Sequence, residues 1–185
     1  TVFCNTPLWT TLKQWSIWFT NTAMNEHSQP AGKTAVILMA HGAPTCVDDI
    51  PLYLKNIRSG TESSPEVIQI IRDRYEAIGG SSPLLEITTD QAAELEKFLN
   101  QDGGNFKVYI GMRNWSPYIR DAVKQMVADG VERVLAMCLA PQYSTWSTKL
   151  YFNALNNALD QHSAGTLPVQ FIGTWANQPN LIDAF

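Results

Sequence analysis

Side chains that can bind a metal or an acidic molecule recur at the ends of apolar runs in this 185-residue chain. They are His41 after 34–40 (TAVILMA), Arg113 after 106–112 (FKVYIGM), the hydroxyl and aromatic side chains of 141–147 (PQYSTWS) after 133–140 (RVLAMCLA), and Trp175 at the end of 169–175 (VQFIGTW). An imidazole is a metal ligand, a guanidinium pairs with carboxylates, and aromatic rings pack on flat molecules. The combination predicts a site for a flat ring that carries acidic groups.

The four apolar runs are predicted to be strands of one sheet, because runs rich in β-branched residues are typical of strands covered on both faces. Helices are predicted between and after them, at about 47–58, 65–78, 90–99, 117–129 and 148–161. Alternating strands and helices indicate a doubly wound, Rossmann-like α/β fold, with a parallel four-stranded sheet and helices on both faces. In such a sheet the loops after the strands gather at one edge, where ligands bind.

Several helix ends are predicted from capping residues. Ser64 and Ser116 each precede a proline, so each is expected to be an N-cap with Pro65 or Pro117 in the first helical turn. Gly79 and Gly80 are expected to end the helix that begins at Pro65, because glycine readily leaves the helical conformation.

Other motifs and the overall charge narrow the chemistry. The sequence has no GxxxxGK[ST] or GxGxxG phosphate loop and no GxSxG nucleophile elbow. A net charge of -4 and a pI of about 5.3 give no reason to expect a nucleic-acid partner. No apolar run approaches the ~18 residues of a membrane span. Three cysteines without metal-binding spacing suit a reducing compartment, so a cytoplasmic location is expected.

Residues 1–32 are predicted to stand apart from a domain at 33–185. Residues 1–23 hold three of the six tryptophans and one charged residue, and Met24 opens a short polar lead into the first strand. We interpret Met24 as the natural start and the preceding residues as an upstream extension. The alternative is an interfacial helix, because four apolar residues fall at helical spacing: Leu8, Leu12, Trp15 and Phe19.

Four segments together resemble the ferrochelatases, and most closely the soluble bacterial enzymes that metallate coproporphyrin III. The segments are ILMAHGAP…DDIPLYLKNIRSG, RDRYEAIGGSSPL, YIGMRNWSPYIRDAVKQMVADGVERV and LAPQYSTWSTKLYFNAL, within about 34–175. Members of this lyase family insert ferrous iron into a porphyrin late in haem biosynthesis. A whole member has two similar Rossmann-like halves, with the porphyrin in the cleft between them.

The resemblance implies porphyrin-binding roles for six residues: His41, Arg58, Arg74, Tyr75, Ser82 and Tyr151. His41 stands where soluble relatives carry a tyrosine that approaches the iron, so it is a candidate axial metal ligand. The family's catalytic His and Glu lie in the second half, and none of the present residues takes those roles. We therefore expect the porphyrin-binding N-terminal half of a chelatase, inactive alone.

The resemblance also implies the substrates and partners. Ferrous iron is a substrate, and the porphyrin is coproporphyrin III or protoporphyrin IX. No organic cofactor is expected, nor an iron–sulfur cluster at Cys4, Cys46 and Cys138, because these cysteines do not reproduce the arrangement of cluster-bearing relatives. The complete protein is expected to be a monomer without membrane contact.

Each candidate has a structural alternative. His41 could be a structural histidine, Arg58 a helix-end cation, and Arg74 a surface partner of Asp73 or Glu76. Tyr143 and Trp146 could be loop packing instead of site residues. Cys46 and Cys138 are expected to pack as small apolar residues and His162 to lie at the surface, and His27 lies in the polar lead. Two other functions stay open, a stand-alone tetrapyrrole-binding module and a small chelatase that dimerises to rebuild the cleft.

Overall fold

The fold is built on four parallel strands in a single sheet. The computed structural model describes residues 32–162 and 167–183. The strands are β1 (Thr34–Ala40), β2 (Phe106–Met112), β3 (Arg133–Cys138) and β4 (Val169–Ile172), in the order β2-β1-β3-β4. β1 pairs in parallel with both β2 and β3, and all seven of its residues are buried. This confirms the predicted doubly wound α/β class.

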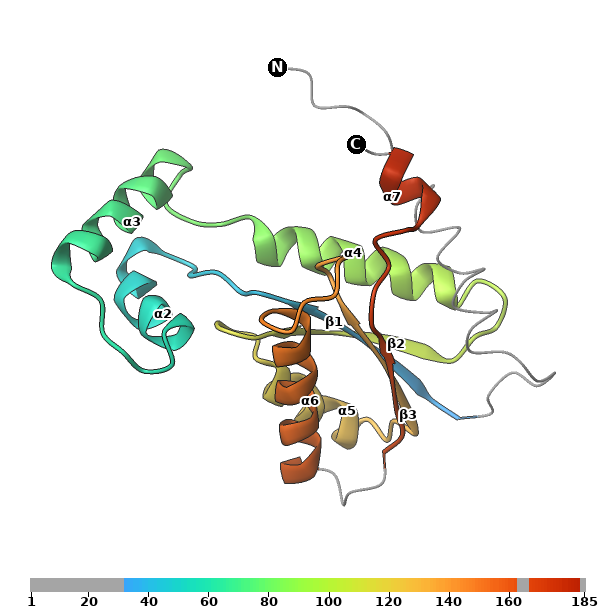
Figure 1. The fold of residues 1–185 in the computed structure, drawn as a ribbon. Coiled ribbons are helices and arrows are strands. Elements are labelled where there is room, and N and C mark those ends of the chain that lie inside the picture. Colours follow the sequence, from blue (N-terminus) through green and yellow to red (C-terminus); the bar gives the residue numbers. More distant parts are fainter. Residues whose placement is uncertain (1–31, 163–166, 184–185) are drawn as a thin grey trace.

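Helices cover both faces of the sheet (Figure 1). α4 (Leu84–Leu99) lies on one face, where its Leu95 packs in a cluster with Val36 and Leu38 of β1. α5 (Ile119–Ala128) and α6 (Thr148–His162) lie on the other, in a cluster that contains Ile37 and Met39. Because successive side chains of a strand point to opposite faces, the continuous apolar run of β1 supplies both cores.

A helical lobe (residues 47–80) separates β1 from α4. It consists of the short 3-10 helix η1 (Val47–Asp49), α2 (Ile50–Ile57) and α3 (Pro65–Ala77), and an ion pair of 3.3 Å joins Arg72 on α3 to Asp48 on η1. The lobe lies beyond the carboxyl end of β1, away from the body of the sheet (Figure 1). The chain ends with the short helix α7 (Pro179–Asp183), which follows β4 and had not been predicted.

Two predicted helix starts are wrong. α4 begins at Leu84 instead of Asp90, although Ile87, Thr88 and Thr89 form a β-branched run that disfavours helix. The hydroxyls of Thr88 and Thr89 donate to carbonyls four residues earlier, at 2.7 and 2.8 Å, so they fit within the helix.

α5 begins at Ile119, with Tyr118 instead of Ser116 at its N-cap position. Pro117 lies outside the helix because its carbonyl accepts a hydrogen bond of 2.7 Å from the Met112 amide at the end of β2. Two predictions near Pro65 are confirmed: Ser64 accepts from the Val67 amide as the N-cap of α3, and Gly79 and Gly80 leave the helix at φ of +97° and +87°. β3 and β4 are shorter than predicted, ending at Cys138 and Ile172.

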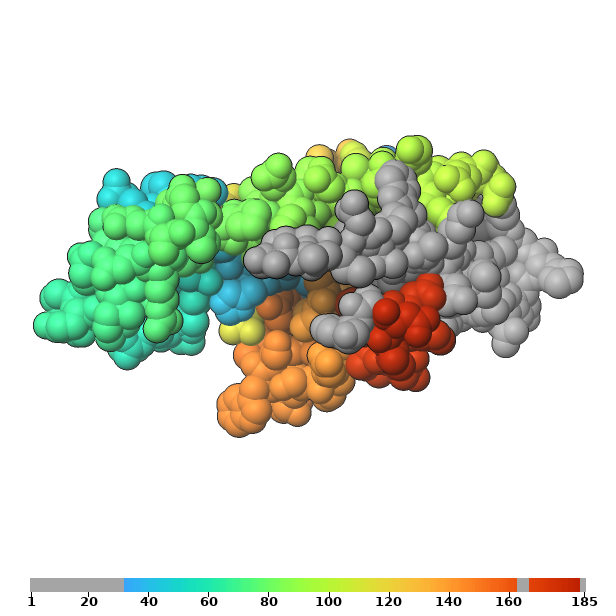
Figure 2. Space-filling model, turned by 90° about the horizontal axis from the view of Figure 1, so that it is seen from above, coloured from blue at the N-terminus to red at the C-terminus, as the bar shows by residue number. Residues whose placement is uncertain are grey.

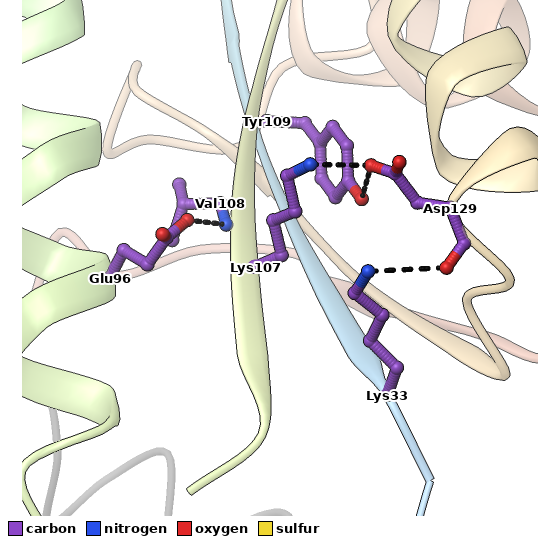
Figure 3. Close-up of polar contacts among 6 residues, drawn as sticks. All are labelled: Lys33, Glu96, Lys107, Val108, Tyr109 and Asp129. Atoms are coloured by element: carbon purple, nitrogen blue, oxygen red, sulfur yellow. Dashed lines mark hydrogen bonds and ion pairs between the residues drawn. The ribbon is translucent and has the colours of Figure 1, made fainter.

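The edge strand β2 is tied to the helices on both of its faces (Figure 3). On the α4 side, Glu96 accepts from the Val108 amide at 2.7 Å, and Asn100 exchanges two hydrogen bonds of 2.9 Å with the Phe106 backbone. These contacts occupy backbone groups that an edge strand otherwise leaves unpaired. On the α5 side, Asp129 accepts from Lys107 at 2.6 Å and from the Tyr109 hydroxyl at 2.7 Å.

Several predictions concern residues outside the described ranges. They include the Met24 start, the proposed separateness of residues 1–32, His27 and Cys4. Within residues 32–162 and 167–183, no helix has the length and apolar character needed to cross a membrane.

Candidate functional site

In a sheet with this strand order, a ligand crevice is expected at the carboxyl ends of β1 and β3. These strands are neighbours, yet the chain leaves β1 toward α4 on one face and leaves β3 toward α6 on the other. Loops that diverge in this way open a crevice where open α/β sheets bind ligands. Figure 2 shows a recess between the helical lobe and the orange segment around the start of α6, with blue and yellow residues at its floor. By the colour bar, these belong to the parts of the chain in and after β1 and β2.

The loops after β1 and β2 are fastened together through their backbones. The Arg113 amide donates to the Ala40 carbonyl, and the Asn114 amide donates to the His41 carbonyl, both at 3.0 Å. Gly42 makes this approach possible, because its φ is +84° and a Cβ there would lie 2.8 Å from the Trp115 nitrogen. His41 is therefore held at a fixed point on the crevice.

The His41 imidazole lies between an aromatic ring and an amide. Tyr53 of α2 meets it edge-on, with centroids 6.2 Å apart, and the Asn114 Nδ2 lies 3.1 Å from its Nδ1 and 3.3 Å from its Nε2. Loss of water on the packed side, together with the Arg113 guanidinium, lowers the pKa of His41 below its usual range. A lowered pKa keeps the imidazole neutral, and the neutral form is the one that binds metals.

Tyr53 joins His41 to the helical lobe. Its hydroxyl donates to the Gly42 carbonyl at 3.2 Å, and the Tyr75 phenol of α3 is close enough to act on its pKa. Burial, followed by the neighbouring Tyr75, raises the pKa of Tyr53 to about 12, and burial also raises the pKa of Tyr75. Both phenols therefore keep their protons at neutral pH and can serve as hydrogen-bond donors.

Arg113 joins His41 to Tyr151 of α6. Its guanidinium lies over the Tyr151 ring, 5.4 Å from the centroid, and its charge acts on His41, Tyr151 and Cys138. Burial raises the pKa of Tyr151 to about 12 and also raises that of the Cys138 thiol. Within the described residues Arg113 forms no ion pair, so its guanidinium can pair with an acidic ligand.

The other predicted binding residues lie around this cluster. Arg58 ends α2 and is exposed, and it donates to the Glu62 carbonyl at 3.3 Å and to the Ser63 hydroxyl at 3.0 Å. Ser82 accepts from the Leu84 amide and lines a hollow of about 390 Å³ together with Thr45 and Thr89. Ring contacts and charge effects link His41, Tyr75 and Tyr151 through Tyr53 and Arg113, whereas within the described residues Arg58 and Ser82 form no hydrogen bond or ion pair with this cluster.

Arg74 lies exposed in the last turn of α3. The alternative in which it pairs with Asp73 or Glu76 is wrong for the described part of the chain, where Asp73 instead accepts from Gln69 at 2.7 Å and no ion pair involves Arg74. Like Arg113, it carries a guanidinium that is available to a carboxylate.

Comparison with known proteins identifies the family. The sequence model of the ferrochelatases, described simply as Ferrochelatase, matches residues 33–185. This chain belongs to the ferrochelatase family. It is 40% identical over 152 residues to Coproporphyrin III ferrochelatase 1 of Bacillus cereus and 43% identical over 152 residues to Coproporphyrin III ferrochelatase of Listeria innocua serovar 6a, matches that cover 81% of this chain and 48% of each relative.

A third relative, named Ferrochelatase, comes from Acidobacterium capsulatum and is 42% identical over 153 residues, covering 83% of this chain and 44% of the relative. The chain thus spans about half the length of the curated ferrochelatases that it matches. The family match includes every described helix and strand, so the crevice lies within the ferrochelatase domain.

The structure decides the remaining interpretations of residues in this ferrochelatase domain. Tyr143 and Trp146 do not pack in their loop, because 52% and 88% of their respective surfaces are exposed. Cys46 is also exposed, since it lies in the turn before η1, whereas Cys138 is buried as predicted. His162 is exposed at the end of α6, as predicted. Among the residues described, no group of three or more His, Cys, Asp or Glu side chains could hold a metal ion.

Sequence reasoning missed Tyr53, Asn56 and Asn114. Asn56 donates to the Asn114 carbonyl and to the Tyr118 hydroxyl, both at 3.2 Å, and so supports the loop that holds His41. Asn114 had a usable signal, because it directly follows Arg113 beyond the end of β2. Tyr53 and Asn56 had none, because their roles depend on how α2 folds back onto the ends of β1 and β2.

Proposed function

We propose that the protein containing this chain inserts ferrous iron into a carboxylate-bearing porphyrin in haem biosynthesis, and that the present domain binds the porphyrin. Membership of the ferrochelatase family supports the reaction class. The substrate is coproporphyrin III or protoporphyrin IX, and two of the relatives are named for coproporphyrin III. We also propose that the complete protein is a cytoplasmic monomer.

The observation that carries the proposal is the arrangement around the crevice. A neutral imidazole, His41, lies near the Arg113 guanidinium, which has no ion pair among the described residues, and the protonated tyrosines Tyr53 and Tyr151 flank them. A metalloporphyrin offers the matching groups, which are a metal that accepts an axial ligand, a flat apolar ring, and acidic side chains at its periphery.

The porphyrin carboxylates are assigned to Arg58, Arg74, Ser82 and Tyr151, together with Arg113 from the end of β2, and Tyr75 is assigned to the ring. Arginine pairs with carboxylates through two parallel hydrogen bonds, and hydroxyls add short charge-assisted ones. Each such contact contributes about 1.5–3 kcal/mol at most, and less where water screens the charges. Arg58 and Arg74 are exposed, so their contributions belong to the screened end of that range.

His41 is proposed as an axial ligand to the iron of the metallated product. Metal insertion releases two protons from the pyrrole nitrogens, and protein groups must accept them. His41 alone does not provide enough acceptors for both protons. The charged neighbour that acts on His41 is a guanidinium, which does not accept protons. We therefore propose that this chain, on its own, binds the porphyrin but does not metallate it.

The same observation favours a second candidate, a tetrapyrrole-binding module without chelatase activity. A crevice with an axial ligand and carboxylate-binding cations is sufficient to hold a haem, even though no proton acceptor in the described part of the chain is paired to the ligand. The two candidates make the same prediction for binding by this chain and differ for the whole protein.

Anaerobic insertion of ferrous iron into coproporphyrin III tests the proposal. The purified chain is expected to bind the porphyrin and to metallate it no faster than the rate without protein, whereas the full-length protein should metallate it rapidly. If the chain alone metallates the porphyrin and His41→Ala abolishes this activity, the proposal of an inactive half is contradicted and the dimeric chelatase is favoured. A full-length protein that binds porphyrin without turnover would favour the binding module.

A further inference from the structure

Asn114 is a polar residue buried at the base of the crevice, and nearly all of its hydrogen bonds involve the His41 loop. Only 4% of its surface is exposed. Its backbone amide donates to the His41 carbonyl at 3.0 Å, and its side-chain Nδ2 donates to that same carbonyl at 3.1 Å. Asn56 of α2 donates to the Asn114 carbonyl at 3.2 Å and fixes it from behind.

The Asn114 amide lies against the face of the His41 ring. Its Nδ2 is 3.1 Å from Nδ1 and 3.3 Å from Nε2. An atom in the plane of the ring cannot be this close to both nitrogens without colliding with Cε1, which lies between them. Nδ2 must therefore lie above the ring plane, where an N–H group meets the π-electrons instead of a nitrogen lone pair.

Tyr53 restrains the same ring without using a ring nitrogen. The two rings are nearly perpendicular, at 85°, with centroids 6.2 Å apart. Trp115 holds Tyr53 in turn through a second edge-on contact at 6.1 Å. The imidazole is thus oriented by contacts with its face and with a neighbouring ring, and among the described residues no carbonyl or carboxylate accepts a hydrogen bond from it.

We propose that Asn114 is a positioning residue for His41, which holds the imidazole by its face so that a ring nitrogen stays available to an iron in the crevice. The iron in this proposal depends on the proposed function, whereas the contact between Asn114 and the face of the His41 ring does not. Metal-binding histidines usually donate their second N–H to a carboxylate or carbonyl, which strengthens the ligand. In the described part of the chain His41 has no such acceptor, so the geometry favours an axial bond that is well oriented but weak, as release of a metallated product requires.

Binding of preformed ferric coproporphyrin III to the whole chain tests the orienting role. The wild type should show the Soret shift of imidazole ligation, and His41→Ala should lose it. Asn114→Ala should bind the porphyrin with unchanged affinity while the ligated fraction falls by about tenfold or more. Asn157→Ala, which removes an exposed asparagine of α6, is the matched control and should resemble the wild type. Equal ligation in Asn114→Ala and the wild type would overturn the proposal.

A second measurement needs no porphyrin and no buried substitution. In the NMR spectrum of the wild type, the Asn114 side-chain amide protons should be shifted upfield by the imidazole ring and should show a nuclear Overhauser contact with it. His41→Ala should move those resonances downfield, whereas His162→Ala should leave them unchanged. Unmoved resonances would refute the face contact even if the porphyrin binds. A wild type that fails to bind porphyrin but shows the upfield shift would refute the proposed function and leave the positioning role supported.

Discussion

Gly42 determines where His41 can lie, because only a residue without a side chain fits between the loops after β1 and β2. Its φ of +84° lies in the left-handed region, and a Cβ would meet the Trp115 nitrogen at 2.8 Å. Gly103 provides a comparison at almost the same φ, +80°, but with open space where its Cβ would be. A substitution at Gly103 therefore tests only the cost of the left-handed backbone, whereas a substitution at Gly42 tests that cost together with a steric clash.

Gly42→Ala is predicted to destabilise the protein more than Gly103→Ala. The left-handed conformation costs an alanine about 1–2 kcal/mol, and forcing an extra methyl group into a packed site adds about 1–3 kcal/mol. Gly103→Ala should incur the first cost alone. Urea unfolding of both variants measures the difference, and equal losses would show that the loops separate easily at Gly42.

The pKa of His41 is predicted to lie below that of an ordinary histidine, about 6.5. Because the folded state then binds fewer protons than the unfolded state, His41 lowers the stability as the pH falls below about 6.5. Arg113→Gln should raise the pKa without restoring it fully, since loss of water is the larger cause and the guanidinium the second. An NMR titration of the His41 ring measures this pKa. Arg133→Gln, at the amino end of β3, is the control. An unchanged pKa in Arg113→Gln would contradict this account of the charge.

At the scale of the elements, Asp129 ties the end of α5 to β2. It accepts from Lys107 and Tyr109, and its backbone carbonyl accepts from Lys33 at 3.1 Å (Figure 3). The hydrogen bond from Lys107, and then that from Tyr109, lowers the pKa of the Asp129 carboxyl. A carboxylate with a lowered pKa stabilises the fold above its unfolded pKa, about 3.9, and that contribution is lost as the pH falls through the folded value.

Asp129→Asn is therefore predicted to lower the free energy of unfolding at pH 7 and to leave it almost unchanged at pH values where the wild-type carboxyl is protonated. Urea unfolding from pH 7 down to below the folded pKa of this carboxyl measures this dependence. Asp121→Asn is the matched control on the same helix, because its pairs with Lys124 and Arg120 are exposed and long, at 3.9 and 4.0 Å. A constant difference between Asp129→Asn and the wild type across this pH range would contradict the account.

The sequence was most informative where one local signal decides the structure. The bounds of β1 and β2 were predicted to the residue, because continuous apolar runs end abruptly at His41 and Arg113. The start of α4 was wrong because the β-branched run from Ile87 to Thr89 disfavours helix, and the threonine hydroxyls offset this by bonding to carbonyls four residues earlier. The start of α5 was wrong because the Pro117 carbonyl bonds to the Met112 amide at the end of β2, which keeps Pro117 out of the helix.

The residues of the candidate site also differ in whether the sequence could predict them. His41 and Arg113 could be predicted because strand ends in a parallel sheet meet at one edge. Tyr151 and Tyr75 came from the family resemblance alone. Tyr53 could not be assigned, because it acts through a contact between segments far apart in the sequence, whereas Asn114 was missed although it directly follows Arg113.

At the scale of the whole molecule, we predict that residues 1–23 add nothing to the stability of the domain. The family match begins at residue 33, and the helices and strands that form the crevice follow it. A chain of residues 24–185 should therefore melt at the same temperature as the full chain. A clear drop in melting temperature would show that the tryptophans of this segment pack on the domain.

Equilibrium titration of the whole chain with coproporphyrin III tests the central claim, which is that the carboxyl edge of this sheet binds an acidic porphyrin. Fluorescence should report saturable binding that weakens as salt is added, because guanidinium–carboxylate pairs are screened. The double variant Arg74→Gln/Arg113→Gln should bind about tenfold more weakly or worse, from two partly screened contacts. Arg133→Gln, an exposed arginine at the first residue of β3 and the opposite edge of the sheet, should bind like the wild type. Absence of binding by the wild type, or equal weakening by Arg133→Gln and the double variant, would contradict the account.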